Sequence, residues 1–141
     1  IFKYILEDKD ISSNLRFLGK MDTDNLINEM LNSHLYIMTS HIENSSNALC
    51  EAMMLGMPCI ATYVGGTDSL VSDNKNGIIV PDDDPYYLAS TILNIRSNFT
   101  FAKDIGNNAR KTALKRHNKE KIISDIIKIY DELLTYNSSY K

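Results

Sequence analysis

Residues 35–63 read LYIMTSHIENSSNALCEAMMLGMPCIATY, and this stretch decides the fold. It opens and closes with short apolar runs, at residues 35–39 and 59–63. Between them a helical pattern begins near Ser45 or Ser46, where a serine can cap the first turn, and stops at Gly56, which suits a helix end. A strand, a helix and a strand in this order are the repeating unit of a parallel α/β sheet.

Two more apolar runs, at residues 14–18 and 77–80, extend this pattern in both directions. We therefore expect a Rossmann-like parallel sheet of at least four strands flanked by helices. Asp22 or Thr23 can cap a helix between the first two strands. Asp84 and Pro85 predict the start of another helix, because proline at the first helical position gives up only an N–H that has no partner there.

The C-terminal third predicts helices alone. The helix that follows Pro85 should bury a stripe made of Leu88, Ala89, Ile92 and Leu93. A helix at residues 101–115 and a last helix opened by Asn118 come next. The apolar residues of the last helix recur with a 3.6-residue period, so we expect it to lie against the sheet or its neighbouring helix; they are Ile122, Ile123, Ile126, Ile127, Tyr130, Leu133 and Leu134.

Length and composition favour one compact domain. The chain has 141 residues, of which 43% are hydrophobic, so we assign 1–141 to a single domain with 101–141 as its C-terminal helices. A net charge of −3 without a run of Lys or Arg argues against nucleic-acid binding. No stretch predicts a bilayer span or a signal peptide, and Cys50 and Cys59 lie within apolar segments as core thiols, so we expect a cytoplasmic protein.

The first residues suggest a fold that begins in the middle of a domain. Phe2, Tyr4, Ile5 and Leu6 resemble part of an element already under way, with no earlier strand to pair with it. We therefore expect a partial domain whose N-terminal strands are missing.

The loop between residues 39 and 47, together with the helix that follows it, contains the candidate binding residues. It follows a strand, and ligands of open parallel sheets bind at the carboxyl ends of the strands. The first amides of the next helix, near Asn47 and Ala48, have no partner within the helix and suit a phosphate group. Glu51 follows Asn47 by four residues, so its carboxylate shares a helical face with those amides. Glu43 precedes the helix and can reach whatever hangs from the far side of the phosphate.

Glu43 and Glu51 are separated by seven residues, and this E-x7-E spacing resembles that of the "glycosyl transferases group 1" family of retaining enzymes with the two-domain GT-B fold. Further blocks resemble the family in the right order over roughly residues 14–93; they are 14–19 (NLRFLG), 35–40 (LYIMTS), 51–62 (EAMMLGMPCIAT), 64–67 (VGGT) and 76–81 (NGIIVP). The chain is thus similar to part of the C-terminal, donor-binding half of such an enzyme.

The resemblance implies roles for individual residues. Glu51 would hold the ribose hydroxyls of a nucleotide-sugar donor, and Glu43 would be the catalytic carboxylate that contacts the donor sugar. The rest of the donor-binding set would be Ser46, Asn47, Ala48, Leu49, Gly65 and Gly66. No metal or other cofactor is implied, and His34, His41 and His117 are expected to be surface or packing residues, although His41 lies beside the site.

The resemblance also implies partners. A hexosyl-type transferase would move the sugar, with retention, to a sugar, lipid or glycan acceptor held by an N-terminal domain that this chain lacks. The full-length enzyme could associate peripherally with a membrane, and the chain alone is expected to be inactive. Two alternatives stay open: a GT-B sugar-nucleotide epimerase that shares the nucleotide site, and a non-catalytic α/β binding module in which Glu43 and Glu51 are solvated.

Overall fold

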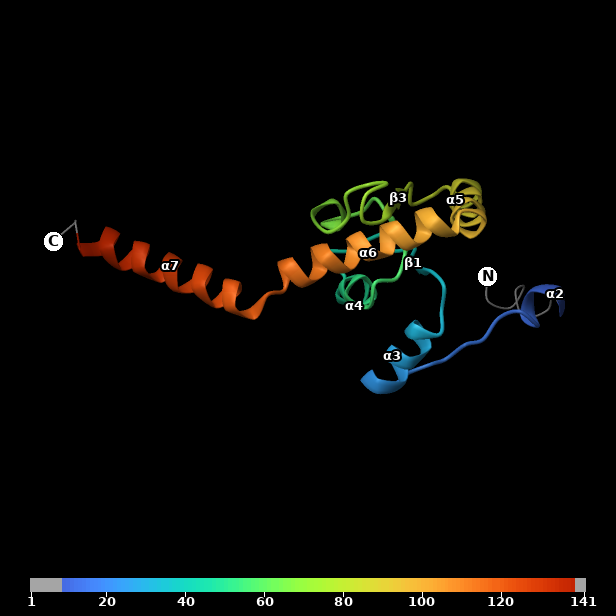
Figure 1. Cartoon of the computed structure of the whole chain (residues 1–141), viewed down its shortest axis with the longest axis horizontal. Coiled ribbons are helices and arrows are strands. Elements are labelled where there is room, and N and C mark those ends of the chain that lie inside the picture. Colours follow the sequence, from blue (N-terminus) through green and yellow to red (C-terminus); the bar gives the residue numbers. More distant parts are fainter. Residues whose placement is uncertain (1–8, 139–141) are drawn as a thin grey trace.

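The protein, seen in a computed structural model, is described over residues 9–138 (Figure 1). The apolar start at residues 2–6 lies outside the described residues. The elements in chain order are α2 (Lys9–Ser12), α3 (Thr23–Leu31), β1 (Tyr36–Met38), α4 (Asn47–Leu55), β2 (Cys59–Thr62), the 3-10 turn η1 (Thr67–Ser69), β3 (Ile78–Val80), α5 (Pro85–Ser97), α6 (Phe99–Arg116) and α7 (Lys119–Ser138).

Three parallel strands in the order β1-β2-β3 form the sheet of the described part. All four residues of β2 are buried, as expected for a central strand that is covered on both faces. Cys59 and Ala61 join a core cluster with α4, whereas Ile60 joins a second cluster with α5 and the start of α6. Since successive side chains of a strand point to opposite faces, the two clusters mark the two covered faces of the sheet.

The helix between β1 and β2 has the ends that the sequence predicts. The Ser46 hydroxyl accepts a hydrogen bond from the Leu49 N–H at 3.2 Å, and Gly56 ends α4 in the left-handed conformation at φ 79°. The caps at Asp22 and Asp84 are confirmed as well, for α3 and α5. These ends depend on local hydrogen bonds and backbone preferences, which explains why sequence alone predicts them.

The predicted strand at residues 14–18 is wrong. The segment has no regular secondary structure beyond a turn and runs as a connection between α2 and α3, away from the sheet (Figure 1). Leu15, Phe17 and Leu18 are all more than two-fifths exposed, so the burial that stabilises an apolar strand is absent. The sheet of the described part therefore has three strands, one fewer than the four that the sequence predicts.

The apolar stripe of α5 is shifted from the predicted one. Thr91 and Ile95 are buried and Leu88 and Ile92 half-buried, but Leu93 is 60% exposed and Ala89 is exposed as well. The buried positions follow a spacing of three or four residues, which the run of adjacent apolar residues in the sequence obscured.

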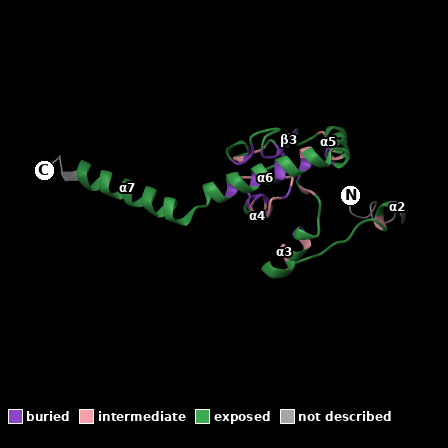
Figure 2. Cartoon of the chain, in the orientation of Figure 1, coloured by how far each residue is buried: buried purple, intermediate pink, exposed green. Residues whose placement is uncertain are grey.

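The last helix does not pack where the sequence predicts. α7 extends away from the sheet, and its residues 119–136 are exposed (Figure 2). The predicted packing against the sheet or its neighbour is therefore wrong for this chain. The apolar residues of α7 still recur every three or four positions, and they form an exposed apolar surface.

Both cysteines are free and buried, which confirms them as core thiols. Burial raises the pKa of the Cys59 thiol to about 12, so this group stays protonated at neutral pH. Within residues 9–138, no helix combines the length and the apolar character that crossing a bilayer requires.

Candidate functional site

The loops after the three parallel strands meet at one edge of the sheet. The buried Thr62 hydroxyl, at the end of β2, donates a hydrogen bond to the Ser40 carbonyl oxygen at 2.6 Å. The Gly66 N–H donates to the Asn44 carbonyl oxygen at 3.0 Å. These two bonds hold the loop after β1, which carries Glu43, against the loop after β2.

Gly65 and Gly66 are required by the closeness of that contact. A Cβ atom on Gly65 would lie 1.5 Å from the Glu43 carbonyl oxygen, and one on Gly66 would lie 2.4 Å from that of Asn44. Gly65 also has φ +51°, a conformation that glycine adopts without steric cost. The structure therefore brings this glycine pair directly beside the backbone of Glu43, as the sequence predicts.

The start of α4 presents two amides of the predicted set. The Leu49 N–H is occupied by the Ser46 hydroxyl, and the Leu49 side chain is fully buried, so this residue supports the core. In the described part of the chain, no hydrogen bond is found to the N–H of Asn47 or Ala48. These two donors point from the positive end of the helix dipole and suit an anion.

Tyr36 is a titratable group in β1 on which both glutamates act. Burial raises the pKa of Tyr36 and is the largest cause of its shift; Cys59, Glu43 and Glu51 raise it further, while a hydrogen bond with Ser46 lowers it. The two carboxylates act in the same direction because a negative charge disfavours the phenolate. The Glu43 side chain also accepts a hydrogen bond from the Asn44 N–H at 3.0 Å, and the Glu51 side chain is exposed.

Tyr36 is a neighbour of the site that the sequence did not single out. It lies in β1 and looks like one more apolar position of a buried strand, so only the fold shows that its hydroxyl reaches Ser46 at the cap of α4. Arg116, the last residue of α6, is a second such residue. Its guanidinium donates to the Ser69 carbonyl oxygen at 3.1 Å and so ties the end of α6 to the turn that follows Gly66.

Of the three histidines, His41 lies in the loop that carries Glu43. Among residues 9–138, one group of side chains has the spacing of metal ligands, and it consists of His41, Asp82 and Asp83. Neither Glu43 nor Glu51 belongs to this group.

Known proteins resemble the chain in sequence and in fold. The family model "Glycosyl transferases group 1" matches residues 2–112. N-acetyl-alpha-D-glucosaminyl L-malate synthase of Bacillus anthracis is 28% identical over 130 residues, which are 92% of this chain and 34% of that protein.

Two solved structures share the fold. Sucrose-phosphate synthase of Thermosynechococcus elongatus superposes with a TM-score of 0.84 at 25% identity, covering 96% of this chain and 34% of the other. HepE of Anabaena, solved in complex with UDP, gives a TM-score of 0.83 at 24% identity over 93% of this chain and 36% of the other. The chain thus spans about a third of the length of the proteins it matches.

Proposed function

Because the chain belongs to the glycosyl transferases group 1 family, we propose that it forms the donor-binding part of a GT-B glycosyltransferase. The complete enzyme transfers a sugar, of hexosyl type and with retention at the anomeric carbon, from a nucleotide-sugar donor to an acceptor. Part of the enzyme outside this chain holds the acceptor, which is a sugar, a lipid or a glycan. The chain by itself does not turn over.

The proposal is supported by the amides of Asn47 and Ala48, which have no hydrogen-bond partner within the described residues. They open α4 directly after the loop of Glu43 and one turn before Glu51. A nucleoside diphosphate places a phosphate and a ribose next to each other. Its distal phosphate binds the two amides, and the ribose hydroxyls donate to Glu51, one turn further along α4. The sugar beyond the phosphate then reaches Glu43.

The start of α4 and Glu43 would also contribute to catalysis. Charge develops on the diphosphate when the bond to the sugar breaks, and the positive end of α4 stabilises that charge. We therefore propose that transfer needs no metal ion and no other cofactor. Glu43 orients the sugar, and the loop that carries it keeps its position because Gly65 and Gly66 lie against its backbone.

Further proposals concern the complete enzyme. We propose that it works in the cytoplasm, does not bind nucleic acid and can associate peripherally with a membrane through parts that hold a lipid-linked acceptor. The acidic balance of this chain, 15 basic against 18 acidic residues, supports the exclusion of nucleic acid.

Separate substitutions of the two glutamates in the complete enzyme test the proposal. Glu51→Ala removes an acceptor of charge-assisted hydrogen bonds, at about 1.5–3 kcal/mol each, so UDP should bind at least about 10-fold more weakly by calorimetry. Glu43→Ala should leave UDP binding nearly unchanged and lower the transfer rate about 100-fold. Asp104→Ala, which removes an exposed carboxylate of α6, is the matched control and should change neither value.

Equal losses of UDP affinity in the two glutamate variants would contradict the assignment of ribose to Glu51 and sugar to Glu43. No binding of UDP, or of any other nucleoside diphosphate, by the unsubstituted enzyme would instead favour the non-catalytic module. Release of a free epimerised sugar without transfer would favour the epimerase.

A further inference from the structure

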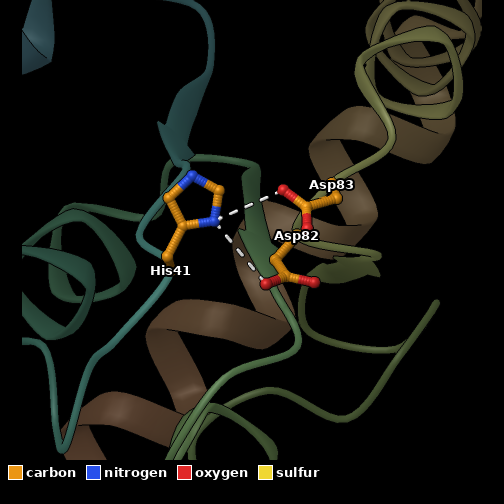
Figure 3. Close-up of side chains that lie close together, drawn as sticks. All are labelled: His41, Asp82 and Asp83. Atoms are coloured by element: carbon orange, nitrogen blue, oxygen red, sulfur yellow. Dashed lines mark ion pairs between the residues drawn. The ribbon is translucent and has the colours of Figure 1, made fainter.

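Three side chains converge beside the candidate site from two separate loops. His41 follows β1, and Asp82 and Asp83 follow β3 (Figure 3). The His41 Nδ1 atom lies 3.6 Å from Asp82 Oδ2 and 3.6 Å from Asp83 Oδ1. All three donor atoms lie within 4.8 Å of one another. The fold therefore brings one imidazole and two carboxylates to a common point.

The distances exclude direct hydrogen bonds and are compatible with an ion pair or with a shared metal ion. A hydrogen bond between nitrogen and oxygen needs about 2.7–3.2 Å, so 3.6 Å is too long for either contact. Zn²⁺ binds histidine nitrogen and carboxylate oxygen at about 2.0–2.2 Å. Two ligands of a tetrahedral ion at those bond lengths lie about 3.3–3.6 Å apart, which matches the separations from Nδ1.

The surroundings leave these three donors free to act as ligands. Asp84, the third aspartate of the run, accepts the Tyr87 N–H at 2.8 Å and caps α5, so its carboxylate is already used. Asp82 and Asp83 make no such backbone bond within the described residues, and both line a cavity of ≈ 290 Å³ together with Thr39 and Thr62. Water in the cavity can supply a fourth ligand.

The donor set selects the class of ion. Carboxylates alone suit Mg²⁺ or Ca²⁺, whereas imidazole together with carboxylates suits Zn²⁺ and related transition-metal ions. The side chain of Asp82 is 43% exposed and those of the other two more so, so the ion exchanges with solvent.

We propose that His41, Asp82 and Asp83 form a tetrahedral Zn²⁺ site. The ion joins the loop that carries Glu43 to the loop that begins α5, and it takes no part in sugar transfer. The proposal rests on the three ligands and not on the proposed function, so the two can fail separately.

Calorimetric titration of the tag-free, chelator-treated protein with ZnCl2 tests the site, and the same titration with MgCl2 tests the choice of ion. We expect one equivalent of Zn²⁺ to bind and Mg²⁺ to bind at least 10-fold more weakly. His41→Ala and Asp82→Asn should each weaken Zn²⁺ binding by about 10-fold or more. His117→Ala removes an exposed histidine elsewhere and should bind as the unsubstituted protein does.

Unchanged circular dichroism and melting temperature of the variants without metal show that they fold. The proposal is overturned if no Zn²⁺ binds, which leaves an ion pair only, or if His41→Ala binds Zn²⁺ as tightly as before. Binding of Mg²⁺ as tight as that of Zn²⁺ overturns the tetrahedral assignment.

Discussion

At the scale of single residues, the contact between Gly65 and Glu43 determines where the site forms. Gly65 and Gly19 both have positive φ, at +51° and +67°, but a Cβ atom on Gly19 meets nothing within 4 Å. Both Gly→Ala variants therefore carry the backbone cost of about 1–2 kcal/mol. Only Gly65→Ala adds a collision with the Glu43 carbonyl oxygen. This collision should lower the free energy of unfolding by a further amount of about 1–3 kcal/mol.

Urea denaturation of the two variants measures this difference, and a UDP titration of the same proteins reports the site. We expect Gly19→Ala to keep its affinity for UDP and Gly65→Ala to lose it. If both variants unfold at the same urea concentration, the loop after β1 moves freely and the close contact does not hold it.

At the scale of elements, α6 comes close to the end of α4 at Gly106. A Cβ atom on Gly106 would lie 2.3 Å from the Gly56 carbonyl oxygen and 3.3 Å from the Pro58 nitrogen, so backbone atoms leave it no room. Helix propensity alone predicts that Gly106→Ala stabilises α6 by about 1 kcal/mol. We expect the collision to outweigh the gain in helix propensity. The free energy of unfolding should then fall by about 1–3 kcal/mol, which is the usual cost of overpacking a core.

Thermal and urea unfolding of Gly106→Ala show whether the gain in helix propensity or the collision with Gly56 is larger. A rise in the melting temperature would contradict the close packing of α6 on α4. Asn107→Ala, at the exposed neighbouring position of α6, serves as the control for propensity and should change stability by less than about 1 kcal/mol.

The same scale shows what sequence could predict. The three strands, the helices α3 to α6 and the caps at Asp22, Ser46, Gly56 and Asp84 follow from local patterns, because each cap acts within one turn of its own position. The segment 14–18 has the apolar residues of a strand, but whether it forms one depends on a partner and on burial, which are tertiary. Tyr36 and the group of His41 with Asp82 and Asp83 were missed for the same reason, since each joins loops or elements distant in sequence.

At the scale of the whole molecule, α7 is a helix whose apolar residues are exposed. Its apolar residues are 41–65% exposed and repeat every three or four positions, so they form a continuous stripe. Since exposed apolar patches of this kind drive association, we expect the 141-residue chain to self-associate through α7 as its concentration rises. The exposed Ile37 of the edge strand β1 offers a second, smaller surface.

Sedimentation velocity over a range of concentrations measures this association. Ile126→Glu places a charge in the stripe and should shift the chain toward monomer, whereas Ser124→Glu adds the same charge to the same helix outside the stripe and should not. A chain that stays monomeric at every concentration would show that the stripe is not an association surface.

We propose that a nucleoside diphosphate binds at the carboxyl edge of the sheet, on the start of α4. Amide NMR of the ¹⁵N-labelled protein during a UDP titration locates this binding residue by residue. We expect saturable shifts of the amide signals of Asn47, Ala48, Gly65 and Gly66, while those of Asn98 and Phe99, at the start of α6, do not shift. Shifts confined to residues away from α4 and the glycine pair, or no saturable shifts at any UDP concentration, would contradict it.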